Sequence, residues 1–294
     1  MDKDVEIYID GKYYPKSQAK ISVYDHGFLY GDGVFEGIRA YGGVVFKLKE
    51  HVARLYDSAH AMMLKIPLTQ EQMVEAVLGT LRKNKLKDAY IRLVVTRGVG
   101  DLGLDPRKCA TATVIIITDH IVLHDGEAKT KGITTIVSWV RRDPVDGTSH
   151  EIKSLNYLNS VMAKIEANMS GADEAICLDK NGCVAEGVGE NIFVVKNGKI
   201  TTPPTSTGAL EGITAKSATA LAKKLGYDIT ITNITPFQLF NADELFFTGT
   251  AAEIVPIRQV NWRQIGNGTA GPVTKKLMVE FKKIVNDPKE GVPI

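Results

Sequence analysis

Runs of hydrophobic residues predict the strands in the first half of the chain. Residues 5–9 alternate between apolar and polar side chains, and Asp10-Gly11 follows them as a hairpin turn. Gly42-Gly43 predicts a second hairpin turn between two apolar runs. The predicted strands of this half are residues 5–9, 37–41, 44–48, 89–97 and 111–118.

Two segments in the same half have apolar residues at helical spacing. Residues 49–63 place Val52, Leu55 and Ala59 on one face. Residues 69–86 repeat this spacing, so both segments are predicted as amphipathic helices.

Strands and helices also mix in the second half, without a regular alternation of strand and helix. Its predicted strands are residues 133–140, 174–178, 192–195 and 244–248, and its predicted helices end near Met169, Leu225 and Val285. A parallel doubly wound sheet would require that alternation, so we expect an α+β fold.

A polar, turn-rich stretch over residues 119–131 is typical of a linker between domains. A chain of 294 residues is long enough to form two domains. We therefore expect a small N-terminal domain over residues 1–118 and a larger C-terminal domain over residues 132–294.

Composition excludes several classes of protein. Hydrophobic residues make up 44% of the chain and charged residues 24%, and the net charge is +2 without a basic cluster, which argues against a nucleic-acid partner. No apolar run approaches a membrane span, and the N-terminus lacks the apolar core of a signal peptide, so we expect a cytoplasmic protein. The three cysteines, Cys109, Cys177 and Cys183, have no metal-ligand spacing, and Cys177 is predicted as a core residue.

Lys153 is the strongest candidate for chemistry. It is the last charged residue before a run of uncharged ones, with Ile152, Leu155 and Leu158 expected around it. A lysine in an apolar setting favours the free amine, which forms a Schiff base with a carbonyl compound. The alternative is an ordinary solvated surface lysine, the commoner situation for this residue type.

Three further stretches have the character of ligand loops. Residues 186–191 join glycines to two carboxylates, Glu186 and Glu190; the alternative is a glycine bulge with exposed acids. Residues 210–214 open a helix, whose N–H groups bind phosphate, or form a plain capped helix start. Residues 249–252 offer backbone N–H groups and one hydroxyl, or form an ordinary small-residue turn.

A fourth stretch, residues 23–37, places four glycines among aromatic residues. Such glycines let the backbone approach a ligand or another subunit closely, and the alternative is a glycine-rich turn lined by core aromatics. A carbonyl for Lys153, a phosphate for a helix start and a ring nitrogen for a carboxylate together describe pyridoxal 5′-phosphate.

The sequence resembles the branched-chain amino-acid aminotransferases of the fold-type IV pyridoxal-phosphate class, particularly those of archaea. The resemblance runs from Val5 to about Leu277. It lies in residues 30–39, 50–55, 90–92, 153–157, 186–191, 212–214 and 249–254. It implies a two-domain fold whose larger domain has a barrel-like sheet.

The resemblance also implies the residues that bind pyridoxal 5′-phosphate. Lys153 would hold the cofactor covalently and move the substrate proton, Glu186 would pair with the ring nitrogen in preference to Glu190, and Tyr157 would bind the ring hydroxyl. The remaining contacts implied for the phosphate and the ring are Arg54, Ile213, Thr214, Thr250 and Leu210.

Substrate contacts are implied in the same way. The substrate α-carboxylate would meet Tyr90, Thr250 and Ala251, and Arg92 would pair with the second carboxylate of glutamate. The side-chain pocket is implied to include Phe35, Tyr30 and Leu104, the latter two partly from a neighbouring subunit of a homodimer or of a multiple of one such as a hexamer.

Three functions follow as hypotheses. The first is transamination of L-leucine, L-isoleucine and L-valine with 2-oxoglutarate. The second keeps the cofactor but acts on D-amino acids or as an aminodeoxychorismate lyase, because Thr96-Arg97-Gly98 resembles the carboxylate-binding arginine of D-amino-acid aminotransferases. The third is a binding or scaffold protein without catalysis, against which Lys153 speaks.

Overall fold

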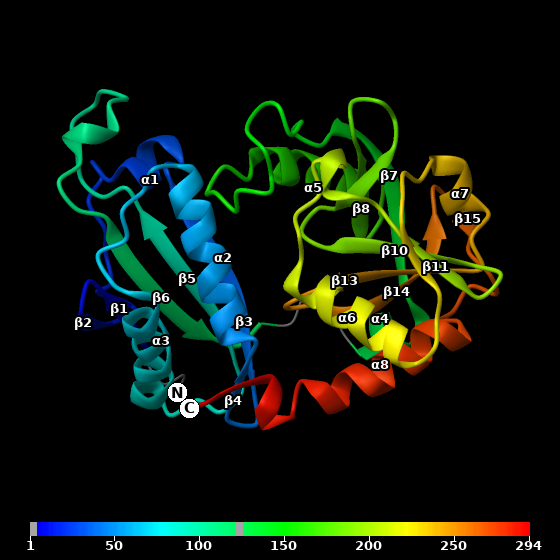
Figure 1. Cartoon of the computed structure of the whole chain (residues 1–294). Helices are drawn as coiled ribbons and strands as arrows, with labels where there is room; N and C mark the ends of the chain where they lie inside the picture. The colour runs from blue at the N-terminus through cyan, green and yellow to red at the C-terminus, as the bar shows by residue number, and fades with distance from the viewer. Residues whose placement is uncertain (1–4, 122–125) are drawn as a thin grey trace. The chain divides into compact units, whose positions relative to one another are not determined.

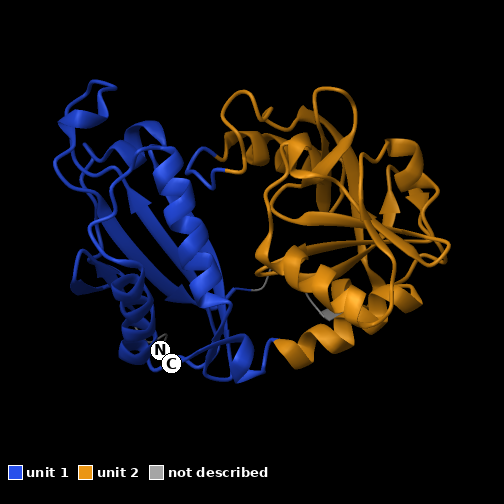
Figure 2. Ribbon diagram, in the orientation of Figure 1, with its two compact units in different colours: residues 1–121, 152–156, 285–294 blue, residues 122–151, 157–284 orange. Residues whose placement is uncertain are grey.

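The computed structural model describes residues 5–121 and 126–294, which fold as two compact units (Figures 1 and 2). Unit 1 holds residues 5–121 together with Ile152–Asn156 and Val285–Ile294, and unit 2 holds the other described residues. The segment around Lys153 thus belongs to unit 1 by its contacts. The expected domain boundaries stay a prediction, and residues 122–125 of the expected linker lie outside the described residues.

Unit 1 is built on a seven-stranded antiparallel sheet with the order β16-β4-β3-β5-β6-β1-β2. Two helices, α2 and α3, pack their apolar stripes on this sheet and form one hydrophobic core with it. The elements are β1 (Glu6–Ile9), β2 (Lys12–Pro15), α1 (His26–Tyr30), β3 (Gly33–Tyr41), β4 (Val44–Phe46), α2 (Leu48–Ala61), α3 (Gln70–Asn84), β5 (Ala89–Thr96), β6 (Thr113–Asp119) and β16 (Gly291–Pro293), with 3-10 turns Pro106–Lys108 and Pro288–Glu290.

The two helices predicted in this half are confirmed to within two residues at each end. Leu55 of α2 and Leu81 of α3 are fully buried, as the helical spacing predicts. A capping box explains where α3 begins, since Thr69 accepts from the Gln72 backbone N–H and the Gln72 side chain accepts from the Thr69 N–H.

Unit 2 is built on a nine-stranded mixed sheet that curls like a partial barrel. Its order is β12-β11-β10-β13-β14-β7-β8-β9, with β15 beside β14, and β9 returns to contact β10. The elements are α4 (Gly126–Lys131), β7 (Ile133–Arg141), α5 (Leu158–Met169), β8 (Glu174–Leu178), β9 (Val184–Gly187), β10 (Asn191–Lys196), β11 (Lys199–Thr202), a 3-10 turn (Thr205–Thr207), α6 (Ile213–Lys224), β12 (Ile229–Ile231), α7 (Pro236–Phe240), β13 (Glu244–Gly249), β14 (Glu253–Val260), β15 (Arg263–Gln264) and α8 (Pro272–Ile284).

The α+β class and the barrel-like sheet are confirmed, but two local predictions are wrong and two short helices were not predicted. Glu186 and Gly187 lie in strand β9 rather than in a loop between strands. The glycine–aromatic stretch contains the short helix α1, and the expected linker contains α4. Leu158, expected to pack around Lys153, is the exposed first residue of α5.

The cysteines are free thiols, and Cys177 is fully buried in β8, which confirms it as a core residue. Burial raises the pKa of its thiol to about 11. Among the described residues, no cluster of three or more metal-ligating side chains occurs. Within the same ranges, no helix is both long and apolar enough to cross a membrane.

A side chain from another element of unit 2 caps the N-terminus of helix α8. Both carboxylate oxygens of Glu244, the first residue of β13, accept the backbone N–H groups of Val273 and Thr274 at 3.0 and 2.8 Å. Gly271 is required just before them, because a Cβ there would lie 2.1 Å from the Glu244 carboxyl carbon.

Replacing this cap should destabilise unit 2. We expect Glu244→Ala to lower the free energy of unfolding by about 2–4 kcal/mol, because two buried N–H groups lose a charged acceptor. Urea unfolding followed by circular dichroism measures this loss. The control is Glu280→Ala, which removes a surface pair with Lys283 on the same helix and should cost no more than about 0.5 kcal/mol. Equal losses in the two variants would contradict the role of Glu244.

Candidate active site

Lys153 is held in unit 1 by its backbone. The Phe35 N–H donates to the Lys153 carbonyl at 3.0 Å, and the Leu155 N–H donates to the Gly33 carbonyl at 2.9 Å. The Lys153 N–H donates to Ser58 Oγ of α2 at 3.2 Å. The segment therefore pairs alongside the start of β3. The half-buried Lys153 side chain places its Nζ 4.6 Å from the centroid of the Phe35 ring.

The glycines before and within β3 make this pairing possible. A Cβ on Gly31 would lie 2.4 Å from the Asn156 side chain, and one on Gly33 would lie 2.7 Å from Leu155. A Cβ on Gly37 would lie 2.2 Å from the Tyr90 hydroxyl oxygen. Close packing within unit 1 therefore accounts for these glycines, as the alternative reading held, and their approach to a ligand or another subunit stays a prediction.

Tyr90, Arg92 and Phe35 form a cluster on one face of the unit 1 sheet. Gly37 of β3 lies opposite Arg92 of β5, and the side chains alternate between the core face and this half-exposed face. Arg92 Nη2 donates to the Tyr90 hydroxyl at 3.2 Å, and the guanidinium lies 4.6 Å from the centroid of the Phe35 ring. The structure thus brings together Lys153 and three predicted substrate residues.

Arg54, predicted to bind phosphate, is anchored by a buried charge that sequence reasoning missed. Its Nε and Nη2 donate to the two oxygens of Glu36 at 2.7 and 2.8 Å, and His51 Nδ1 lies 2.7 Å from Glu36 Oε2. Burial raises the pKa of Glu36, but the charge of Arg54, aided by His51, outweighs burial and lowers it to about 2. Burial lowers the pKa of His51.

Arg97 has a structural role in unit 1. Its Nε and Nη2 donate to both oxygens of Asp32 at 2.9 Å. Nη1 and Nη2 also donate to the carbonyls of Met63 and Met62, where α2 ends, at 2.8 and 2.9 Å. A guanidinium with these partners is positioned to close the end of a helix, which weakens its candidacy as a substrate-binding arginine.

Tyr30 and Leu104 lie in the outer part of unit 1. The Tyr30 hydroxyl donates to the Leu102 carbonyl at 2.5 Å, so the loop after β5 is tied to α1. Leu104 of this loop is 78% exposed. Their predicted place in a side-chain pocket stays a prediction.

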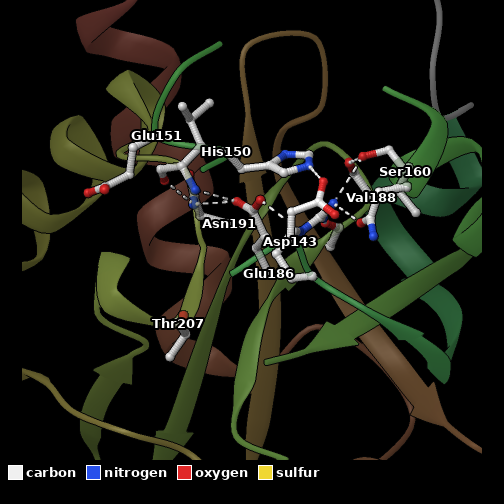
Figure 3. A network of polar contacts seen from close by, with 12 residues as sticks. Asp143, His150, Glu151, Ser160, Glu186, Val188, Asn191 and Thr207 are labelled. Atoms are coloured by element: carbon white, nitrogen blue, oxygen red, sulfur yellow. Dashed lines mark hydrogen bonds and ion pairs between the residues drawn. The ribbon is translucent and has the colours of Figure 1, made fainter. Parts of the chain in front are cut away.

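In unit 2, Glu186 is a buried carboxylate with two hydrogen-bond donors and an ion-pair partner from three segments (Figure 3). Its Oε2 accepts from the Leu210 N–H at 3.0 Å and from Asn191 Nδ2 at 3.3 Å. Its Oε1 lies 3.2 Å from Nε of Arg142, a residue that sequence reasoning did not single out. These donors favour the ionised form of Glu186.

Asn191 connects Glu186 to the start of α6. Its Nδ2 also donates to the Leu210 carbonyl at 2.7 Å, and a Cβ on Gly212 would lie 1.9 Å from its Oδ1. Gly212 is the N-cap of α6, and no described side chain caps this helix. The first turn, with the buried Ile213 and Thr214, therefore offers backbone N–H groups to an anion.

The remaining predicted cofactor residues of unit 2 are Tyr157, Thr250 and Ala251. Tyr157 stands at the N-terminus of α5, with its ring centroid 5.8 Å from that of His150, whose Nε2 pairs with Asp143 at 3.0 Å. Thr250 and Ala251 lie half-buried in the turn between β13 and β14. The side chain of Glu190 packs on this turn, since a Cβ on Gly249 would lie 3.1 Å from its Cγ. Glu190 and Glu186 thus occupy different surroundings.

Comparison with known proteins defines the class of this chain. Residues 33–260 match the model of the family described as amino-transferase class IV. The chain belongs to this family.

Individual proteins that resemble this chain narrow the comparison further. The chain is 56% identical to a "putative branched-chain-amino-acid aminotransferase" of Methanocaldococcus jannaschii, over 95% of this chain and 96% of that protein. A crystal structure of the T.th. branched-chain amino acid aminotransferase with pyridoxamine 5′-phosphate matches with a TM-score of 0.93 at 40% identity, over 98% of this chain and 97% of that one. The same enzyme complexed with N-(5′-phosphopyridoxyl)-L-glutamate matches with a TM-score of 0.91, at the same identity and coverage.

The buried Glu36 should make the stability of the protein depend on acid. Its pKa in the folded state, about 2, lies below its ordinary value of 4.5, so its stabilisation is present above pH 4.5 and is lost as the pH falls toward 2. Glu36→Gln should lower the free energy of unfolding at neutral pH and flatten its decline below pH 4.5, as urea unfolding at a series of pH values can measure.

The matched control for this pH series is Glu50→Gln. Glu50 lies at the surface of α2, the helix that carries Arg54, and pairs with Lys47, so the profile should keep its wild-type slope. A Glu36→Gln profile that runs parallel to the wild-type profile would contradict the buried ion pair.

Proposed function

We propose that this chain is a pyridoxal 5′-phosphate-dependent aminotransferase that converts L-leucine, L-isoleucine and L-valine, with 2-oxoglutarate, to branched-chain 2-oxo acids and L-glutamate. The main support is that a class IV aminotransferase, similar over its length to enzymes named for branched-chain amino acids, has Lys153 beside Phe35. The Tyr90–Arg92 pair stands on the same face as Phe35.

The residues fit the cofactor by the chemistry of their groups. Lys153 supplies an amine for a carbonyl carbon, Glu186 a buried carboxylate for a ring nitrogen, and Tyr157 a hydroxyl for a ring oxygen. Arg54, Thr214, Thr250 and the N–H groups at the start of α6 suit a phosphate, and Gly212 leaves room for the Asn191 side chain beside that helix start. When bound, the cofactor supplies a ring that withdraws electrons from the substrate Cα.

Each of these side chains then has its own role. Lys153 Nζ holds the cofactor and later takes the proton from the substrate Cα, as a general base. Glu186 keeps a proton on the ring nitrogen, because an ionised carboxylate stabilises a neighbouring cation much more when both are out of water. Glu36 fixes the guanidinium of Arg54 through two hydrogen bonds, so that it meets the phosphate in one orientation.

Substrate choice follows from the same cluster. The Phe35 ring offers an apolar wall to a branched side chain, and the resemblance adds Tyr30 and Leu104 to this pocket, while Leu210 is expected to pack against the cofactor ring. The guanidinium of Arg92 suits the second carboxylate of glutamate, and Tyr90, Thr250 and Ala251 suit the α-carboxylate. The guanidinium of Arg92 beside the Phe35 ring in unit 1 thus suits both an acidic and an aliphatic substrate.

The proposal also includes an oligomeric state: a homodimer, or a multiple of one such as a hexamer. The exposed face of α5 supports self-association, because large apolar residues follow one another at helical spacing along it. These residues are Leu158, Val161, Met162, Ile165 and Met169. The cytoplasmic location stays a prediction.

A half-reaction tests the substrate class. Adding L-leucine without an oxo acid should convert the absorbance of the bound aldehyde cofactor to that of pyridoxamine 5′-phosphate, because Lys153 and the cluster around Phe35 accept an L-branched side chain. D-alanine should react more slowly by at least about tenfold. Faster conversion by D-alanine would favour a D-amino-acid aminotransferase, and an unchanged spectrum with both would remove the proposed function.

Lys153→Ala should abolish turnover, with a residual rate below about 1% of the wild-type rate, because the protein loses the amine that binds the cofactor. Borohydride reduction followed by peptide mapping should label the peptide of Lys153 in the wild-type protein. Lys180→Ala, at an exposed lysine that pairs with Asp146, should retain full activity and the label. Substantial turnover by Lys153→Ala would show that another residue holds the cofactor.

A further inference from the structure

Arg142 is among the largest fully buried side chains of the described residues, although arginine is rarely buried without partners. It follows β7 directly, and its N–H donates to the Leu178 carbonyl of β8 at 2.8 Å. Its Nη1 donates to Asn159 and to Ser160 at 3.0 Å, and its Nη2 donates to the Gly187 carbonyl. Two elements of unit 2, α5 and β9, thus hold the guanidinium, and the backbone bond to β8 fixes where the side chain starts.

The remaining edge of the guanidinium faces Glu186. Nε of Arg142 lies 3.2 Å from Glu186 Oε1, and both side chains are almost completely buried. Burial alone disfavours an ionised carboxylate, and a cation at this distance offsets that cost. The Leu210 N–H and Asn191 hold the other oxygen, Oε2, so the carboxylate has one orientation.

We propose that Arg142 is a positioning residue that keeps Glu186 ionised, so that the proton shared between Glu186 and the ring nitrogen of the cofactor resides on the nitrogen. This inference rests on the proposed function.

The physical reason is a competition for one proton. A carboxylate and a ring nitrogen that face each other can share a proton on either atom, and a cation beside the carboxylate lowers its affinity for that proton. Arg142 approaches the carboxylate from β7, while Leu210 and Asn191 approach it from the start of α6 and from β10. Without Arg142, the proton should shift toward Glu186, and the ring should withdraw electrons less strongly.

Arg142 also packs in the core of unit 2, so the experiment must separate charge from packing. The probe is holoenzyme reconstituted with pyridoxal 5′-phosphate labelled with ¹⁵N in the ring, because the ¹⁵N chemical shift reports whether that nitrogen is protonated. The half-reaction with L-leucine is measured on the same samples, and thermal unfolding checks that each variant is folded.

We expect the wild-type protein to give the shift of a protonated ring nitrogen. Arg142→Met should move the shift toward that of the unprotonated ring and slow the half-reaction at least about tenfold. Arg142→Gln, which keeps a polar amide of shorter reach but has no charge, should behave in the same way and serves if the Met variant does not fold. Arg142→Lys, which keeps the charge, should restore most of the wild-type shift.

Two controls show whether Arg142 acts through Glu186. In a Glu186→Gln background, adding Arg142→Met should change the shift little and the rate by less than about twofold, because the carboxylate is already absent. Arg141→Met, at the exposed neighbour whose Nη1 donates to the Ser138 carbonyl, should leave both unchanged.

The inference is overturned if folded Arg142→Met protein keeps the wild-type shift and rate. It is also overturned if Arg142→Met has the same effect with and without Glu186, because the residue then acts by packing alone. If the wild-type protein binds no pyridoxal 5′-phosphate, the proposed function fails first, and that outcome differs from both of these.

Discussion

The backbone pairing between the Lys153 segment and the first residues of β3 is the constraint on which the candidate site depends. The chain leaves unit 2 after Glu151, lies along β3 in unit 1 for five residues, and returns to unit 2 at Tyr157. Hydrogen bonds through Phe35 and Gly33 hold this passage, and backbone bonds do not depend on the side chain of Lys153. The amine can therefore serve chemistry while the main chain around it serves the fold.

Each unit contains a buried ion pair, and the two pairs are arranged in the same way. Glu36 pairs with Arg54 in unit 1, and Glu186 faces Arg142 in unit 2. In each pair one partner is a predicted ligand residue and the other is almost completely buried. A buried ion pair is a weak source of stability, since desolvation cancels much of the attraction, but it fixes charge and orientation. The two pairs thus orient the side chains proposed to meet the phosphate and the ring nitrogen before any ligand arrives.

The sequence predicted elements with long periodic patterns well. Helices α2, α3, α6 and α8 begin and end within two residues of the predicted positions, since their apolar spacing extends over several turns. Strand β9 escaped prediction because it has four residues, one of them the acidic Glu186. Lys153 and Glu186 were singled out through the resemblance to a known family, and their roles stay a prediction.

Partners that depend on tertiary contacts could not be predicted. Arg141 and Arg142 are adjacent and chemically identical, yet the first is exposed and the second is buried against Glu186. Which of the two arginines turns inward depends on where β7 ends and on where β9 lies in the sheet. The same holds for Glu36, whose motif signalled importance but not its bonds to His51 and Arg54.

The two candidate substrate arginines illustrate how local geometry decides between functions. Arg92 lies within β5 on the half-exposed face, where the alternation of the strand places it with Tyr90 and opposite Gly37. Arg97 lies just beyond the end of β5, where the chain turns, and its donors meet Asp32 and the end of α2. Four of the five N–H groups of the Arg97 guanidinium already have partners at Asp32 and at the end of α2, which leaves little for a substrate carboxylate. The register of one strand therefore favours Arg92 for an acidic substrate and argues against the D-amino-acid alternative.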